Sequence, residues 1–276
     1  MPTITVADGV ELHHEIHGEG DPVLLITGTS ASIGLWTPAV IEALAAEHRV
    51  IAYDHRGMGG STPSTEPVSM ASLAADAAAL LDALDVGPAH VVGWSLGSAV
   101  AQELVLARPD LVASIVLYGT WPRADGFQRS IMAGLRGPWA TGDVPTALQA
   151  LGIAFSPQML DHPEFEQLFG AFLPLFPQTA DQVAMTVNQW DADLAHDTAD
   201  RLGSIDRPTT VLVGEQDLLT PPWQSRAVAD LIPGAAFVLV EGPGASHGLH
   251  VERPDDWLAA VTTHLARHAP AAASAD

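Results

Sequence analysis

The chain has 276 residues, of which 47% are hydrophobic, and its 33 acidic and 11 basic residues give a formal net charge of −22. This length and hydrophobic content allow a large core in one domain, with or without an insertion, and the negative charge argues against nucleic acid or an anionic membrane as a partner. The absence of cysteine excludes disulfides, cysteine-ligated metals and a thiol nucleophile.

In chain order, the predicted elements begin with a hairpin formed by Thr3–Val6 and Val10–His17. Strand-like runs then alternate with helix-like segments. The strands are expected at Val23–Thr27, Val50–Tyr53, His90–Gly93, Ser114–Tyr118, Thr209–Gly214 and Ala236–Val240. The helices are expected at Trp36–Glu47, Met70–Leu84, Leu96–Ala107, Pro222–Leu231 and Val251–His268. This alternation predicts the α/β class, with a mostly parallel, doubly wound sheet that has helices on both faces.

The alternation breaks between residues 121 and 200, where several helix-like pieces are separated by prolines and no buried strand is evident. We expect a core from residues 1–120 and 201–268, with 121–200 inserted as a helical cap over the edge of the sheet where ligands bind. Much of the cap's apolar content should form its own core, and the remainder should line a pocket for an apolar substrate. The candidate substrate-binding residues are Trp94, Trp121, Phe169, Phe172 and Trp190.

The two ends of the chain bear on localisation. The first nine residues contain neither a basic run nor a long apolar stretch, so we expect no signal peptide. No uncharged segment has the length and character of a membrane span. We therefore expect a cytoplasmic protein with no membrane partner. The Ala- and Pro-rich residues 269–276 are expected to form a disordered tail.

A G-x-S-x-G pentapeptide, the pattern of a serine displayed at a tight strand-to-helix turn, occurs twice, around Ser95 and around Ser246. Ser95 directly follows a strand-like run and precedes a helix-like segment. Ser246 follows Gly242-Pro243-Gly244, which indicates a loop, and no helix-like run begins before about Val251. This context favours Ser95 as a nucleophile.

A serine nucleophile needs a base, and twelve histidines compete for that role. His247 is favoured because it follows the last strand, on the edge of the sheet where Ser95 is expected. His250 is the main rival. The group His13, His14 and His17 is expected to lie on an exposed hairpin rather than to bind a metal, because alternation separates the side chains and no i,i+4 zinc spacing is present.

The base in turn needs a carboxylate that orients it. Asp217 follows the strand Thr209–Gly214, again at the carboxyl edge, and is the favoured acid. Glu215 lies nearer the strand end, and Asp125, early in the insertion, is a second alternative. The chain order Ser95, Asp217, His247, with all three at strand ends, favours a catalytic triad.

Acyl transfer also requires donors for a developing oxyanion. The backbone N–H of Leu96, at the start of a helix, is one candidate. The backbone N–H of Thr29, in the loop after the first buried strand, is the other.

Four segments together resemble the α/β-hydrolase fold superfamily, in its serine-nucleophile branch of esterases and lactonases: Gly93-Trp94-Ser95-Leu96-Gly97, residues 54–61, residues 214–217, and Ser246-His247 with Glu252-Arg253-Pro254. The likeness extends to about His268 and implies the triad Ser95, Asp217 and His247. Thr27-Gly28 stands where the family usually has His-Gly. Ser95 replaces the aspartate nucleophile of the dehalogenases and epoxide hydrolases of this fold, which disfavours those activities.

The leading hypothesis is hydrolysis of a carboxylic ester or lactone of a small apolar molecule through an acyl-enzyme on Ser95, with no cofactor and no metal. The loop from Thr27 to Ser32 and the capped layout are similar to enol-lactonases and to methylesterases that act on polyketides. Carbon–carbon bond hydrolysis or cofactor-free perhydrolysis would use the same triad. A non-hydrolytic ligand-binding protein or cyclase is the alternative of another class. The oligomeric state is left open.

Overall fold

The computed structural model describes residues 2–7 and 9–268. These residues form an eight-stranded sheet in the order β1-β2-β4-β3-β5-β6-β7-β8. The pairs β1–β2 and β2–β4 are antiparallel, and all the other pairs are parallel. The strands are β1 (Thr3–Ala7), β2 (Val10–His17), β3 (Asp21–Ile26), β4 (His48–Tyr53), β5 (Ala89–Trp94), β6 (Val112–Tyr118), β7 (Thr209–Gly214) and β8 (Ala236–Val240). The predicted fold class is confirmed. The expected tail at 269–276 lies outside the described residues.

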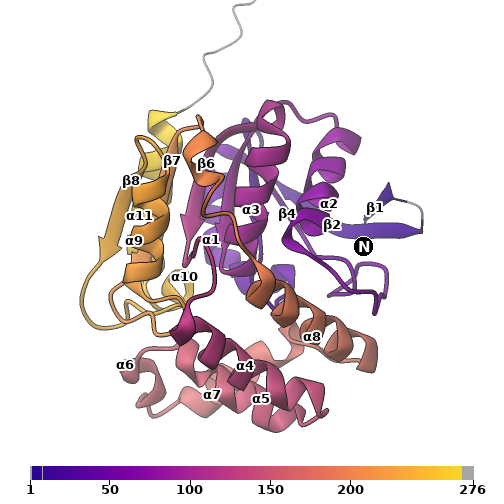
Figure 1. Cartoon of the computed structure of the whole chain (residues 1–276), viewed down its shortest axis with the longest axis vertical. Coiled ribbons are helices and arrows are strands. Elements are labelled where there is room, and N and C mark those ends of the chain that lie inside the picture. The colour runs from indigo at the N-terminus through magenta and orange to yellow at the C-terminus, as the bar shows by residue number, and fades with distance from the viewer. Residues whose placement is uncertain (1, 8, 269–276) are drawn as a thin grey trace, which may run out of the picture.

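Helices cover both faces of the sheet (Figure 1). On one face, α1 (Pro38–Ala45) and α11 (Pro254–Arg267) pack against each other and on the strands. On the other face lie α2 (Met70–Ala83), α3 (Leu96–Ala107) and α9 (Pro222–Leu231). Alternate residues of each central strand serve the two cores, as in β3, where Leu24 and Ile26 face one side and Val23 and Leu25 the other. Burial on both faces explains the continuous apolar runs of the sequence.

The sequence predicts one continuous final helix from Val251 to His268, and this prediction is wrong. The structure has a short helix α10 (Leu249–Glu252), a break at Arg253 and then α11. Pro254 supplies the reason, since its ring disfavours helical backbone at the preceding residue, and Arg253 has φ −134° and ψ 57°. Pro254 itself occupies the first position of α11, where a missing N–H costs nothing.

The expectation that the histidines of the first hairpin are exposed is wrong for His13 and His14, which are 4% and 7% exposed. For His13 the reason is that the loop after β4 covers it: its N–H donates a 2.9 Å hydrogen bond to the Ser61 hydroxyl, and a Cβ at Gly60 would lie 2.9 Å from its ring. The Nδ1 of His13 lies 2.7 Å from Oδ2 of Asp54, and that oxygen also accepts a hydrogen bond from the backbone N–H of Gly60. The other oxygen, Oδ1, accepts one from the backbone N–H of Ile33. Asp54 thus ties β2 to the loops that follow β3 and β4.

Between β6 and β7 the described residues are helical. This helical segment contains α4 (Gly126–Ala140), α5 (Val144–Ala150), α6 (Pro157–Leu160), α7 (Phe165–Phe172) and α8 (Ala180–Ala195). The side chains of Asp125, Asp143, Ser156 and Thr179 cap the first turns of α4, α5, α6 and α8. Figure 1 shows the segment gathered at one end of the sheet, with α8 lying beside α4. No helix among the described residues is long and apolar enough to cross a membrane.

Candidate active site

Ser95 lies at the sharp turn between β5 and α3, in a backbone conformation rarely adopted by residues other than glycine, with φ 55° and ψ −122°. Its N–H donates a 2.9 Å hydrogen bond to the carbonyl of Tyr118 on β6. A non-glycine residue at positive φ costs about 1–3 kcal/mol and persists only where the surrounding structure holds it. Here the strain displays the hydroxyl-bearing side chain at the carboxyl end of the sheet.

The two glycines that flank this turn are required by close backbone contacts. A Cβ at Gly97 would lie 2.1 Å from the carbonyl oxygen of Ile26, and one at Gly93 would lie 2.3 Å from the carbonyl oxygen of Gly97. Both separations are far inside van der Waals contact, so α3 can begin directly against β3 only with glycine at these positions.

The second pentapeptide has a different environment. Ser246 is fully buried, and its hydroxyl donates a hydrogen bond to Glu252 and accepts one of 3.0 Å from the N–H of Gly248. Glu252 also accepts a 3.0 Å hydrogen bond from the N–H of Ser156 in the helical segment. Ser246 therefore joins the loop after β8 to that segment.

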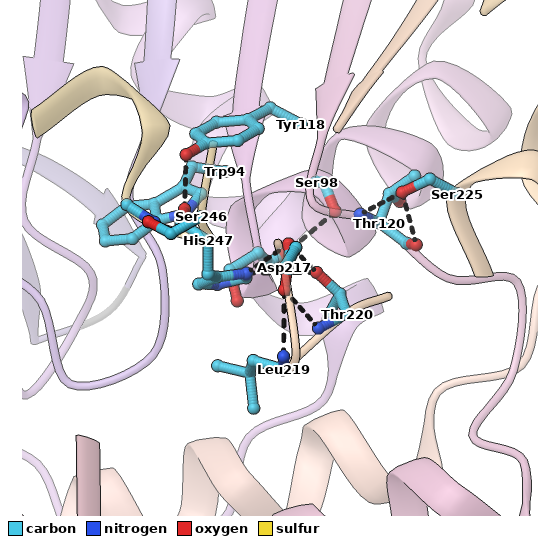
Figure 2. A network of polar contacts seen from close by, with 12 residues as sticks. Trp94, Ser98, Tyr118, Thr120, Asp217, Leu219, Thr220, Ser225, Ser246 and His247 are labelled. Carbon is cyan, nitrogen blue, oxygen red and sulfur yellow. Dashed lines mark hydrogen bonds and ion pairs between the residues drawn. The ribbon is translucent and has the colours of Figure 1, made fainter. Parts of the chain in front are cut away.

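His247 lies in the same loop, and Figure 2 shows its ring directed at Asp217. Its Nδ1 is 2.8 Å from Oδ2 of Asp217, and both side chains are buried. The backbone carbonyl of His247 accepts hydrogen bonds from the hydroxyl of Tyr118 and, at 3.1 Å, from the indole N–H of Trp94. Ring and backbone are thus fixed independently.

Asp217 is held by four donors, as the dashed lines in Figure 2 trace. Its Oδ1 accepts from the N–H groups of Leu219 at 2.9 Å and Thr220 at 2.8 Å. Its Oδ2 accepts from the Thr220 hydroxyl at 2.9 Å as well as facing His247. A carboxylate so held can keep an imidazole in one tautomer, with the proton on Nδ1 and Nε2 free to accept another.

The rival base and acids lie in other settings. His250 is fully buried and contacts Trp94 with its ring, its Nε2 is 3.1 Å from the carbonyl of Leu35, and burial lowers its pKa to about 3. Glu215 is exposed and accepts a 2.8 Å hydrogen bond from the N–H of Gly242. Asp125 caps α4 by accepting from the N–H of Gln128 at 2.8 Å. None of these three residues lines the cavity beside Ser95.

That cavity has a volume of about 60 Å³ and lies between the sheet edge and the helical segment. Ser95 and His247 both line it. Its wall is largely apolar and is completed by Gly28, Thr29, Ser30, Leu35, Trp94, Leu151, Ala154, Phe155, Phe172, Phe176, Trp190, Leu219, Gly248 and Val251.

Of the aromatic residues expected to bind substrate, Trp94, Phe172 and Trp190 line this cavity. Trp121 and Phe169 do not. Trp121 is fully buried with its ring edge-on to His196, and Phe169 stacks on Phe165 in the helical segment. The hydrophobic pattern marks all of these residues as apolar but does not distinguish the core of the segment from its inner surface.

Other lining residues were not singled out from the sequence. Leu35 and Val251 are isolated apolar residues in irregular or short helical stretches, where no periodicity reveals their direction. Leu219 carried a usable signal, since it follows Asp217 by two residues in a loop already placed at the carboxyl edge.

The two residues expected to supply oxyanion donors, Leu96 and Thr29, both lie close to Ser95. Leu96 is the first residue of α3, so its N–H has no partner within the helix. The loop after β3 passes directly beside Ser95, because a Cβ at Gly28 would lie 3.2 Å from the Cβ of Ser95, and Thr29 lines the cavity. Thr27 stands at the position where the α/β-hydrolase family usually has histidine. It is fully buried, and no partner of its hydroxyl is found among the described residues.

No group of three or more histidine, aspartate or glutamate side chains within residues 2–7 and 9–268 is arranged to hold a metal ion. The polar groups at the cavity include the hydroxyl of Ser95 and the imidazole of His247, which is paired with the carboxylate of Asp217. This set is suited to acyl transfer through a serine.

Comparison with known proteins agrees with this fold. The family model described as alpha/beta hydrolase fold matches residues 21–254. The chain is 34% identical over 253 residues to the protein named "Putative carbamate hydrolase RutD" of Azorhizobium caulinodans, covering 89% of this chain and 91% of that one. It is 32% identical over 297 residues to Rhodomycin D methylesterase DauP of Streptomyces sp. (strain C5), covering 96% and 98%. The crystal structure of the enol-lactonase from Burkholderia xenovorans LB400 superposes with a TM-score of 0.86 at 25% identity, covering 96% and 100%.

Proposed function

The chain belongs to the α/β-hydrolase fold family, and we propose that within it the protein is a serine hydrolase that cleaves a carboxylic ester or lactone of a small apolar molecule. The observation that carries this proposal is the cavity wall. Ser95 and His247 line one apolar cavity, and the imidazole is paired at 2.8 Å with the buried carboxylate of Asp217.

In the proposed reaction, His247 accepts the proton of Ser95 through Nε2 while Oγ attacks the substrate carbonyl. Asp217 holds the Nδ1–H and stabilises the imidazolium as it forms. The carbonyl oxygen becomes an oxyanion, which the N–H groups of Leu96 and Thr29 stabilise. His247 then donates its proton to the departing alkoxide, leaving the acyl group on Ser95. Water, deprotonated by His247, attacks the acyl-enzyme, and as the bond to Ser95 Oγ breaks His247 returns the proton to that oxygen and the acid is released.

The size and polarity of the cavity favour an apolar substrate with a short acyl group. The cavity beside Ser95 is small, about 60 Å³, and its wall is largely apolar. The names of two relatives, a methylesterase and an enol-lactonase, support ester or lactone cleavage. We therefore propose short-chain esters and small lactones as the substrate class.

The test is a panel of p-nitrophenyl esters from acetate to octanoate, together with small lactones, assayed with the wild type and with S95A. We expect turnover of the short esters and a loss of about 10⁴-fold or more in kcat for S95A, the scale seen when a serine nucleophile is removed. A fluorophosphonate probe should label Ser95 in the wild type.

The chain contains its own matched control. S246A alters the serine of the other pentapeptide and should leave labelling at Ser95. Turnover by S95A equal to that of the wild type, or labelling at Ser246 instead, would contradict the proposed mechanism.

A further inference from the structure

Helix α8 of the helical segment contacts the loop that carries Thr29 through two buried side chains on one face of the helix. The hydroxyl of Thr29 donates a 2.7 Å hydrogen bond to Oδ2 of Asp193. The N–H of Ser30 donates a 2.8 Å hydrogen bond to Oε1 of Gln189. Gln189 and Asp193 are four residues apart and therefore lie one above the other on the helix. Adjacent residues of the loop are thus each held by α8.

This loop needs external support because its own backbone is strained. Ser30 has φ 61°, a left-handed conformation that favours glycine. The turn that contains it is closed by a hydrogen bond of 3.3 Å, from the N–H of Ala31 to the carbonyl of Gly28. Within the described residues the Ser30 hydroxyl has no partner. The two contacts from α8 therefore hold a conformation that the loop would not keep by itself.

Asp193 is poorly placed for stabilising the fold. It is 1% exposed, and its Oδ1 is buried with no partner among the described residues. Burial raises the pKa of its carboxyl to about 7, although the hydrogen bond from Thr29 acts in the opposite direction. A buried carboxyl group with an unsatisfied oxygen destabilises a folded protein. Such a cost is typical of residues that serve a site at the expense of stability.

We propose that Asp193 and Gln189 are positioning residues that hold the turn at Thr29 and Ser30, so that the Thr29 N–H is directed at the oxyanion that forms on the substrate attached to Ser95. This inference rests on the proposed function. It makes α8 a part of the catalytic arrangement, because the donor beside Ser95 keeps its place only while α8 is docked on the loop.

The test uses pairs of variants that remove or keep the hydrogen bond. D193A and T29V remove it, and we expect kcat on p-nitrophenyl acetate to fall about tenfold or more, since small displacements of a catalytic group cost up to about 10²-fold. KM should stay within about threefold, because the oxyanion contact forms in the transition state. D193N keeps an acceptor oxygen and T29S keeps the hydroxyl, so both should retain most of the activity. The double variant D193A/T29V should be no slower than the slower single variant.

Two controls lie on the same helix. Asn188 donates hydrogen bonds of 2.8 and 3.2 Å to the carbonyls of Thr65 and Glu66, and Asp191 pairs with Arg136, so N188A and D191A disturb α8 without touching the loop. Both should keep wild-type kcat. The rate of fluorophosphonate labelling should fall in D193A and T29V, while the thermal unfolding midpoint of D193A stays at or above that of the wild type.

The outcomes separate the two proposals. If S95A abolishes turnover but D193A and T29V match the wild type, or if N188A and D191A slow kcat equally, the positioning role is overturned and the proposed function stands. A fall in kcat that D193N and T29S do not restore would also overturn it. If the wild type turns over no ester and Ser95 is not labelled, the proposed function itself has failed.

Discussion

At the scale of single residues, the choice of acid depends on its hydrogen-bond partners rather than on its distance along the chain from β7. Glu215 is closer to the strand end, yet it faces the loop at Gly242. Asp217 is turned inward by the N–H groups of Leu219 and Thr220, which hold one carboxylate oxygen and leave the other for His247. Glu215 and Asp217 are thus only two residues apart, yet Glu215 binds a loop and Asp217 contacts the imidazole of His247.

D217N tests that role. The amide is nearly isosteric but can donate to His247 Nδ1 and so favour the wrong tautomer, and the same change in a serine triad lowers kcat about 10⁴-fold. We expect a loss of that order in steady-state hydrolysis of p-nitrophenyl acetate. E215Q and D125N, which change the two rival carboxylates, serve as matched controls and should keep kcat within about twofold of the wild type. A D217N enzyme as fast as E215Q would contradict the assignment.

At the scale of elements, the contact between the start of α3 and the end of β3 fixes the position of Ser95, the proposed nucleophile. Gly97 allows the helix backbone to approach the Ile26 carbonyl. The same approach brings Gly28, just beyond β3, against the Cβ of Ser95. One close contact between two elements therefore fixes the positions of both Ser95 and the neighbouring loop.

G97A should separate these elements or expand the core between them. Because the added Cβ would lie 2.1 Å from a backbone oxygen, which cannot move like a flexible side chain, we expect the free energy of unfolding to fall by about 3 kcal/mol, the upper end of overpacking costs. Urea unfolding followed by tryptophan fluorescence measures this.

The control for G97A is also a helical glycine. Gly134 is exposed in the middle of α4, and a Cβ there would meet no atom within 4 Å. G134A should therefore stabilise the protein by about 0.5–1 kcal/mol through helix propensity. Equal changes in the free energy of unfolding for G97A and G134A would show that a Cβ at Gly97 does not destabilise the fold through its contact with the Ile26 carbonyl.

The elements themselves were largely predictable from the sequence, for reasons that are local. Thr209–Gly214, Pro222–Leu231 and Ala236–Val240 have the predicted bounds because continuous apolar runs and flanking turn residues mark them. The break at Arg253 was missed although Pro254 was a visible signal. The burial of His13 was not visible, since it depends on the loop after β4, which covers it.

The site was predictable only in part, because some of its contacts join distant segments. The candidates Ser95, Asp217 and His247 each follow a strand, and the carboxyl ends of parallel strands meet at one edge. The contact of Asp193 with Thr29 spans 164 residues and leaves no periodic trace in the sequence. It follows from the way α8 docks on the sheet edge, which side-chain packing of the whole segment decides.

At the scale of the whole molecule, buried titratable groups link the fold to pH. Burial lowers the pKa of His196 to about 4 and those of His250 and His264 to about 3. Unfolded histidine titrates near pH 6.5, so below that pH these three residues are protonated in the unfolded state but remain neutral in the folded state. Their contribution to stability is complete above about pH 6.5 and is lost as the pH falls. Asp193 acts in the opposite sense. Its pKa is about 7 in the folded state and about 4 in the unfolded state, so between these two pH values the carboxyl is protonated when folded and ionised when unfolded.

These opposing groups predict the slope of stability against pH. Between pH 6 and pH 5 the three histidines outweigh Asp193 by two protons, so the free energy of unfolding should fall by about 3 kcal/mol per pH unit from these four groups. H264Q removes one histidine while keeping an amide that can bond the hydroxyls of Thr210 and Ser114, and it should make the slope shallower by about 1 kcal/mol per pH unit. D193N removes the opposing carboxyl and should steepen it by a similar amount. Urea unfolding at pH 6.0 and 5.0 measures both slopes, and because only the difference between the two pH values is compared, a constant loss of stability in either variant cancels. Slopes that shift in the same direction in H264Q and D193N would refute the assignment of these buried groups.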